Sequence, residues 1–222
     1  MNNKKIFAAE FIGSFFLLST IVGSGIMGDR LSDGSAGLAL LANSIATGAG
    51  LIVLIMMFSP SSGAHFNPLI SLAECLHGRI SKLSLTVYLT AQLLGAVTGV
   101  IVTHLMFSEA WISFSVHDRG GSALMLSEFI ATFGLILIIR MMGLHRRQDI
   151  PLAVGLYIMA AYWFTASTSF ANPVVTVARS LTSTFVGIPT TNILGFVIVQ
   201  ILGAATAEFV FKYVFQNKEL KV

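Results

Sequence analysis

Two Asn-Pro pairs, Asn67-Pro68 and Asn172-Pro173, stand inside apolar stretches of this chain. Asparagine is a favoured helix N-cap, because its side-chain oxygen accepts a hydrogen bond from a free backbone N–H of the first turn. Proline is tolerated at the next position, where its missing N–H has no helical partner to lose. Each pair therefore predicts a helix start among hydrophobic residues, with the NH₂ group of the asparagine free to donate to a passing solute.

The helix after each pair is too short to cross a membrane. Residues 67–77 would form about 15 Å of helix, roughly half of a hydrocarbon core about 30 Å thick. We therefore expect two half-helices that dip into the membrane, each with its Asn-Pro pair at the buried tip. A helix start carries roughly half a positive elementary charge, so two facing starts would oppose cations and protons. The preceding stretches, SSGAHF and ASTSFA, would offer backbone carbonyls along a water-filled path.

The composition of the chain indicates an integral membrane protein. Of the 222 residues, 55% are hydrophobic and 10% are charged, whereas a soluble domain carries roughly 25% charged residues. Apolar runs close to the roughly 20 residues that span a bilayer predict six spans. They lie at about 6–27, 38–58, 83–107, 123–142, 150–168 and 191–214.

The net charge of +3 follows the positive-inside rule rather than indicating a nucleic-acid partner. With six spans and the N-terminus inside, ten of the thirteen basic residues are cytoplasmic, and both termini are too. These ten are Lys4, Lys5, Arg79, Lys82, Arg140, Arg146, Arg147, Lys212, Lys218 and Lys221.

The chain repeats itself in two halves, at about 1–110 and 120–216, within one transmembrane domain that covers residues 1–222. AEFIGSFFLL matches SEFIATFGLI, FNPLISLAE matches ANPVVTVAR, and QLLGA matches QILGA, in the same order. Each half holds three spans, so the second half enters the membrane inverted, and such repeats place a pathway near the midplane. The pairs Gly95/Gly99 and Gly203/Ala207 predict closely packed helices.

The motifs AEFIGSFFL, SGAHFNP, NPVVTVAR and Q-x-x-G-A resemble those of the major intrinsic protein family, the aquaporins and aquaglyceroporins. The resemblance covers nearly the whole chain. It implies an all-α membrane fold with six tilted spans, two re-entrant half-helices, one pore per protomer and a homotetramer. It also implies that Glu10 and Glu128 brace the two loops, and that His65 lines the pore on the cytoplasmic side.

The chain departs from the family pattern at the Asn-Pro motifs. The family's usual third residue is alanine, but Leu69 and Val174 stand here. Three residues after the second asparagine, most members carry an arginine that narrows and charges the outer constriction, and this chain has Val175.

The remaining filter positions implied by the family are Thr47, Ser169 and either Ala160 or Ala161. Together with Val175 they predict a wide, weakly polar, uncharged filter. Arg179 lies seven residues after Asn172, about 10 Å further toward the periplasm. We expect it to satisfy backbone carbonyls at the end of the half-helix rather than to restore the filter charge.

The favoured hypothesis is a passive channel in a bacterial inner membrane for small uncharged solutes, namely water, glycerol and metalloid hydroxides such as arsenite. The filter without arginine resembles a bacterial subgroup associated with arsenic resistance. The alternative is an ion- or proton-coupled transporter that uses Glu10 and Glu128. Glu208 does not support this alternative, because Lys212 stands four residues on and predicts an ordinary helical ion pair.

The sequence gives little support to an enzymatic function. There is no P-loop, no GxGxxG after a strand and no HExxH, and the five histidines are scattered. The single cysteine, Cys75, excludes an internal disulfide and an all-cysteine metal site. We therefore expect no cofactor and no metal.

Overall fold

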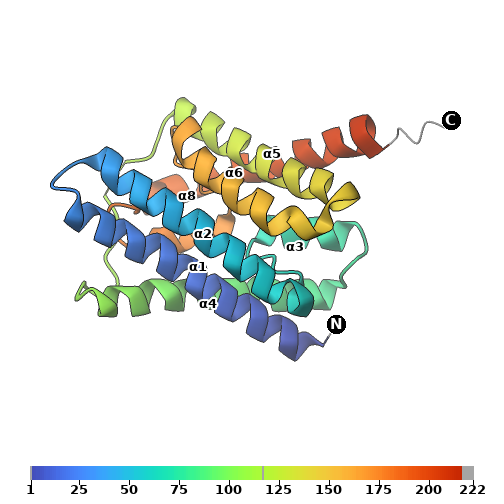
Figure 1. The fold of residues 1–222 in the computed structure, drawn as a ribbon, viewed down its shortest axis with the longest axis horizontal. Coiled ribbons are helices and arrows are strands. Elements are labelled where there is room, and N and C mark those ends of the chain that lie inside the picture. The colour runs from blue at the N-terminus through green and yellow to red at the C-terminus, as the bar shows by residue number, and fades with distance from the viewer. Residues whose placement is uncertain (1, 117, 217–222) are drawn as a thin grey trace.

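The computed structural model describes residues 2–116 and 118–216, which form a bundle of long helices around two short ones (Figure 1). The first half contains α1 (Asn3–Leu31), α2 (Ala36–Ser62), α3 (Pro68–Leu76) and α4 (Lys82–Met106). The second half contains α5 (Ser122–His145), η1 (Arg147–Asp149), α6 (Ile150–Phe164), α7 (Pro173–Arg179), α8 (Thr190–Val210) and the π-helical η2 (Phe211–Gln216). The two half-helices are α3 and α7. The predicted all-α fold, six membrane helices with two half-helices, is confirmed.

Among the described residues, five helices are long and apolar enough to cross a membrane by themselves: α1, α2, α4, α5 and α8 continued by η2. The sixth, α6, has 15 residues, about 22 Å of helix, and ends at Phe164 where a span to residue 168 was predicted. It stops because Thr165 turns to extended backbone. The N–H and the hydroxyl of Thr165 both donate to the carbonyl of Ala161, at 3.2 and 2.6 Å. The chain then enters the loop before α7.

Small residues let the helices within each half approach closely, as predicted. In the first half, Cβ atoms added at Gly95 and Gly99 would lie 2.2 and 2.4 Å from backbone oxygens of α1. In the second half, a Cβ at Gly203 would lie 2.4 Å from the backbone oxygen of Phe129 on α5. These α1–α4 and α5–α8 contacts are equivalent under the repeat.

The two halves meet where α2 crosses α6 and where α7 contacts α3 and α4. At the first crossing, a Cβ on Gly48 would lie 2.7 Å from the Gly155 oxygen, and a Cβ on Gly155 would lie 2.5 Å from the Gly48 oxygen. The start of α1, the end of η2 and helix α3 lie at the same end of the bundle (Figure 1). The half-helix tips meet in the interior, because Asn67 and Asn172 are both buried and α3 contacts α7.

Candidate functional site

Each half-helix begins at an asparagine that caps it. The Asn67 Oδ1 accepts from the N–H of Leu69 at 3.0 Å. The Asn172 Oδ1 accepts from the N–H groups of Val174 and Val175, at 3.0 and 3.4 Å. Pro68 and Pro173 occupy the first helical position in both cases, where no backbone donor is lost.

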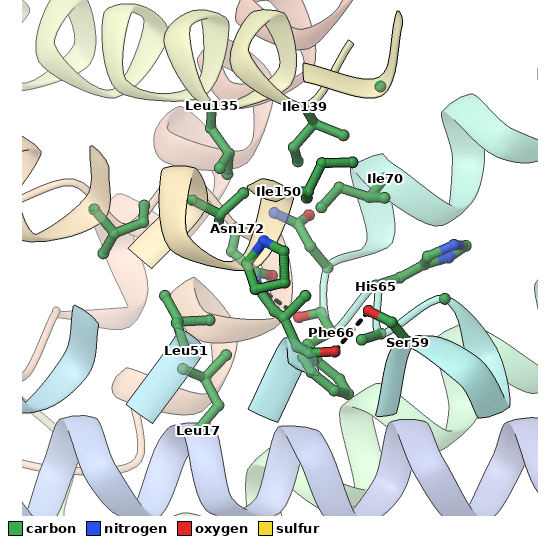
Figure 2. A pocket seen from close by; sticks show the side chains of 18 of the residues that line it. Leu17, Leu51, Ser59, His65, Phe66, Ile70, Leu135, Ile139, Ile150 and Asn172 are labelled. Carbon is green, nitrogen blue, oxygen red and sulfur yellow. Dashed lines mark hydrogen bonds between the residues drawn. The ribbon is translucent and has the colours of Figure 1, made fainter. Parts of the chain in front are cut away.

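The side-chain amides of the two asparagines also tie the two loops together. The Asn67 Nδ2 donates to the carbonyl of Ala171 at 2.9 Å. The Asn172 Nδ2 donates to the carbonyl of Phe66 at 2.7 Å (Figure 2). The expectation that each NH₂ group is wholly free is therefore wrong. An amide NH₂ has two protons and each of these bonds uses one, which leaves one proton for a solute.

The loops that lead to the asparagines share an unusual backbone. Ala64 and Phe66 in the first loop have φ values of 53° and 47°, and Ser169 and Ala171 in the second have 50° and 49°. A non-glycine residue in this left-handed region costs about 1–3 kcal/mol and persists only where its surroundings fix it.

Two buried carboxylates fix these loops. Glu10 accepts from the N–H groups of His65 and Phe66 at 2.9 and 2.8 Å. It also accepts from the Ser62 hydroxyl and the Gln92 side chain, at 2.6 and 2.8 Å.

Glu128 does the same in the second half. It accepts from the N–H groups of Phe170 and Ala171, at 2.8 and 2.9 Å, and from the Gln200 amide at 2.7 Å. Both carboxylates are fully buried, and among the described residues that line the central cavity neither appears. Gln92 and Gln200, which the sequence showed only as repeat markers, hold these carboxylates in place.

A cavity of about 860 Å³ runs past the two asparagines. On α2 and α6 one set of its wall residues recurs every four residues, which places this set on one face of each helix. These wall residues are Thr47, Leu51, Ile55 and Ser59 on α2, and Ile150, Val154, Ile158 and Tyr162 on α6. Leu17 and Ile21 of α1 and Leu135 and Ile139 of α5 add apolar walls (Figure 2). These walls are therefore mostly apolar, although charged residues such as Glu74, Arg79, Arg140 and Arg179 also line the cavity.

Five of the predicted site residues besides Asn172 line this cavity: Thr47, His65, Asn67, Ser169 and Val175. The His65 ring stacks on Tyr88 with ring centroids 4.5 Å apart, and its Nδ1 lies 3.0 Å from the Ser71 hydroxyl. Leu69 and Val174 pack instead into the surrounding cores. Leu69 lies with Ile136, Ala204 and Ala207, and Val174 lies in the large central cluster.

The structure does not bring the predicted filter residue of the fifth span to the cavity. Ala160 is exposed on the outer surface of α6, and Ala161 is fully buried but is not among the described cavity-lining residues. Tyr162 lines the cavity instead, and its hydroxyl donates to the Thr47 hydroxyl at 3.3 Å. The pore face of α6 follows the four-residue spacing from Ile150, so it reaches position 162 and not 160 or 161. The cavity wall is therefore bulkier on this side than the sequence predicted.

Arg179 differs from its expected role in one respect. Its Nε donates to the carbonyl of Val186 at 2.5 Å, which confirms that it satisfies backbone at the end of α7. It also lines the cavity, although its Cα lies two turns beyond the tip. Its guanidinium carbon lies 3.4 Å from the centre of the Phe170 ring, because helical side chains lean toward the N-terminus.

A second arginine that sequence reasoning missed lies close by. The Arg119 guanidinium lies 5.3 Å from the centre of the same Phe170 ring, and burial lowers the pKa of Arg119 while the Glu128 carboxylate opposes that shift. Its nitrogens donate to the carbonyls of Gly187, Ser167 and Phe185, at 2.7, 3.4 and 3.5 Å. No local pattern in the sequence links position 119 to these loops.

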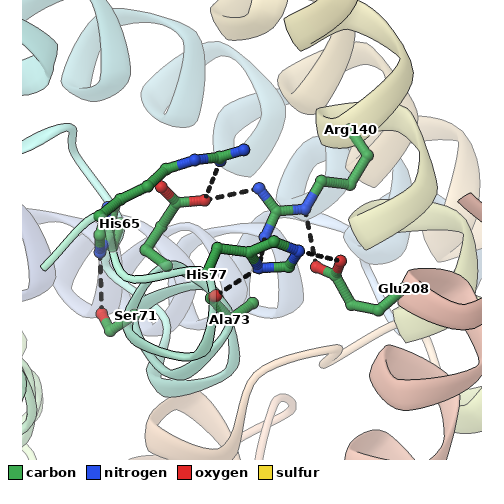
Figure 3. A network of polar contacts seen from close by, with 8 residues as sticks. His65, Ser71, Ala73, His77, Arg140 and Glu208 are labelled. Carbon is green, nitrogen blue, oxygen red and sulfur yellow. Dashed lines mark hydrogen bonds and ion pairs between the residues drawn. The ribbon is translucent and has the colours of Figure 1, made fainter. Parts of the chain in front are cut away.

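At the other end of the cavity, charged side chains form a network (Figure 3). Arg140 donates to Glu74 at 2.5 Å and to Glu208 at 2.7 Å, and Arg79 donates to Glu74 at 2.8 Å. His77 Nε2 lies 3.5 Å from Glu208. The predicted Glu208–Lys212 pair is wrong, because the chain changes to π-helix at Phe211 and Lys212 lies over the ring of Tyr213.

Six membrane helices, two capped half-helices and a cavity past their tips define a membrane protein of the inverted-repeat, re-entrant-loop class. The sequence pattern of the major intrinsic protein family matches residues 1–169, and the chain belongs to this family.

Three known proteins illustrate its relationships. The chain is 48% identical to the aquaglyceroporin AqpS of Rhizobium meliloti (strain 1021), over 94% of this chain and 89% of that protein. It is 30% identical to aquaporin NIP1-1 of Zea mays, over 96% of this chain and 76% of that protein. Its fold is similar to the aquaglyceroporin of Plasmodium falciparum, with a TM-score of 0.75 and 18% identity over 96% of this chain and 97% of that one.

Proposed function

We propose that this protein is a passive channel for small uncharged solutes, namely water, glycerol and metalloid hydroxides such as arsenite, and that it excludes ions and protons. The observation that carries the proposal is the cavity past two facing helix tips, each capped by an asparagine that lines it. The similarity to an aquaglyceroporin over 94% of the chain supports the same conclusion.

The chemistry at the tips favours neutral solutes. Each asparagine has one amide proton bonded to the opposite loop and one left to donate to a solute oxygen. The helix starts each carry about half a positive charge, which opposes a cation at the same point. The apolar residues that make up most of these walls cannot replace the hydration shell of an ion, and removing that shell is costly.

The filter that we propose comprises Thr47, Tyr162, Ser169 and Val175. Valine at position 175 leaves more room beside α7 than an arginine would, while Tyr162 narrows the opposite side. Thr47 and Ser169 supply hydroxyl groups to the solute. Such a mixed filter suits compact molecules that carry several hydroxyl groups, and both glycerol and As(OH)₃ are of this kind.

The role that we propose for Glu10 and Glu128 is to brace the loops. Each accepts two loop N–H groups and a glutamine amide, which occupies the oxygens that a proton relay would need. Their burial away from the cavity lining favours the channel over the coupled transporter.

The setting that we propose is a bacterial inner membrane, with both termini cytoplasmic, one domain over residues 1–222 and a homotetrameric assembly with one pore per protomer. The basic residues at the end of the bundle that holds α3 support this orientation. Two of them, Lys218 and Lys221, lie outside the described residues.

Reconstituted vesicles test the proposal. Stopped-flow light scattering would measure water, glycerol and arsenite permeability for the wild type, Val175→Arg and the uncharged size control Val175→Leu. We expect wild-type flux of all three solutes, and a selective loss of glycerol and arsenite flux relative to water in Val175→Arg. Unchanged ratios in Val175→Arg would show that position 175 lies outside the filter.

A further inference from the structure

We propose that Arg179 supplies the cationic hydrogen-bond donor of the outer filter, in place of the arginine that position 175 lacks. This inference rests on the proposed channel function and adds a selectivity residue to it.

The side chain of Arg179 reaches back to the level of the filter. Val175 and Arg179 are one turn apart on α7, so their Cα atoms are separated by about 6 Å along the helix. The guanidinium does not stay at the level of its Cα, because it stacks face-on over Phe170 at 3.4 Å. Phe170 directly follows Ser169, a filter residue. The charge therefore lies beside the filter, although the residue stands one turn beyond it in sequence.

The guanidinium is fixed in place but not fully bonded. Arg179 is 1% exposed, and its Nε donates to Val186. Its Nη1 is buried and has no hydrogen-bond partner among the described residues. A buried donor without a partner is unfavourable, and Arg179 lines the cavity. A solute oxygen that enters the cavity would satisfy this donor.

A second unpartnered group lines the same cavity beside it. The hydroxyl of Ser169 is buried and, within the part of the chain that the structure describes, has no hydrogen-bond partner. A hydroxyl can donate and accept, whereas a guanidinium can only donate. The pair therefore fits a neutral solute with hydroxyl groups, which can accept from Arg179 and exchange a hydrogen bond with Ser169. A cation fits neither the fixed positive charge nor the donor.

Arg119 provides a matched comparison within the same protein. It is also buried and also contacts Phe170, but three of its nitrogens donate to backbone carbonyls. It is not among the described residues that line the cavity. Arg119 therefore holds the outer loops in place, whereas Arg179 presents a free donor to the pathway.

The test compares Arg179→Met with Arg119→Met in vesicles that contain the full chain. Proper folding is checked by size-exclusion chromatography, and potassium and proton conductance are measured together with the glycerol-to-water permeability ratio. We expect Arg179→Met to raise cation conductance about tenfold, the order of effect of removing one nearby charge, and to change the permeability ratio. We expect Arg119→Met to lower thermal stability and leave cation exclusion intact. The double variant Val175→Arg/Arg179→Met should restore exclusion.

Equal cation conductance in wild type and folded Arg179→Met would overturn the inference. A rise in cation conductance in Arg119→Met as large as that in Arg179→Met would overturn it too. If Arg179→Met does not fold, Arg179→Lys keeps the charge without the planar donor fork. Arg179→Lys should retain cation exclusion, and its glycerol-to-water permeability ratio should fall severalfold. A permeability ratio equal to that of the wild type would count against Arg179 as a donor. A wild type that passes no neutral solute would refute the channel itself, which is a separate result.

Discussion

The two re-entrant segments, residues 62–76 and 167–179, use one scaffold and differ at its outer ends. Both have a capping asparagine, left-handed residues just before it and a glutamate that accepts two loop N–H groups. The repeat even pairs the ring contacts, because His65 stacks on Tyr88 where Phe170 packs against Phe196.

The difference begins two turns into each half-helix, where the repeat pairs Glu74 with Arg179. Glu74 is neutralised by Arg140 and Arg79 in an ion-pair network. Arg179 has no carboxylate partner among the described residues and keeps one nitrogen free. Backbone hydrogen bonding therefore constrains the centre of the protein, whereas the two ends of the cavity differ in charge, one neutralised by ion pairs and the other positive.

The largest expected effect tests the shared scaffold. Glu10→Ala removes the carboxylate acceptor of four donors and Glu128→Ala that of three, and a buried donor that loses its acceptor costs about 1–3 kcal/mol. We expect losses of at least about 4 and 3 kcal/mol respectively, which would lower the melting temperature by at least about 8 and 6 °C.

Thermal unfolding of the detergent-solubilised protein measures this ranking. Glu109→Ala is the control, since that carboxylate pairs with Arg30 at the surface and should change little. A Glu10→Ala protein as stable as the control would show that the carboxylates do not brace the loops.

The second largest expected effect tests the ion-pair network around Arg140 and Glu74. Arg140→Met leaves Glu74 and Glu208 without their buried partner, and breaking such a pair costs about 3–5 kcal/mol. We expect about 3 kcal/mol, at the lower end, because both carboxylates are partly exposed. Arg79→Met removes the exposed partner of the same Glu74 and should cost at most about 1 kcal/mol. Equal losses in the two variants, measured by the same melting assay, would contradict the central place of Arg140 in the network.

The smallest effect tests the symmetry of the tips. Asn67→Ala and Asn172→Ala each remove a cap worth about 0.5–2 kcal/mol and one cross-loop bond worth about 1 kcal/mol. We expect Asn172→Ala to lose slightly more, because Asn172 caps two N–H groups and Asn67 caps one. Asn172→Ser retains a capping oxygen without the amide, so its melting temperature should fall between those of wild type and Asn172→Ala. If Asn172→Ser were no more stable than Asn172→Ala, the capping oxygen would not stabilise the protein.

Features that depend on neighbours in sequence could be predicted. The Asn-Pro caps, the half-helix length and the close Gly contacts follow from local geometry, and the repeat identified the equivalent positions. The pore face of α6 was also available from the four-residue spacing that leads from Ile150 to Tyr162. Counting along the family pattern gave Ala160 or Ala161 instead.

Features that depend on side-chain reach and distant partners could not be predicted. Glu208 on α8 forms an ion pair with Arg140 on α5, whereas the helical i,i+4 rule predicts a pair with Lys212. The rise of the helix places Arg179 about 10 Å beyond Asn172, but the guanidinium reaches back over the Phe170 ring. The cross-loop bonds of Asn67 and Asn172 required both loops to be placed together.

The central claim, a passive pore for neutral solutes, is tested most directly by glycerol flux into wild-type proteoliposomes with and without an imposed proton gradient. The account predicts flux that rises linearly with glycerol concentration and that neither the gradient nor an uncoupler changes. Saturating flux that depends on the gradient and collapses with the uncoupler would contradict it and would indicate coupled transport through Glu10 and Glu128.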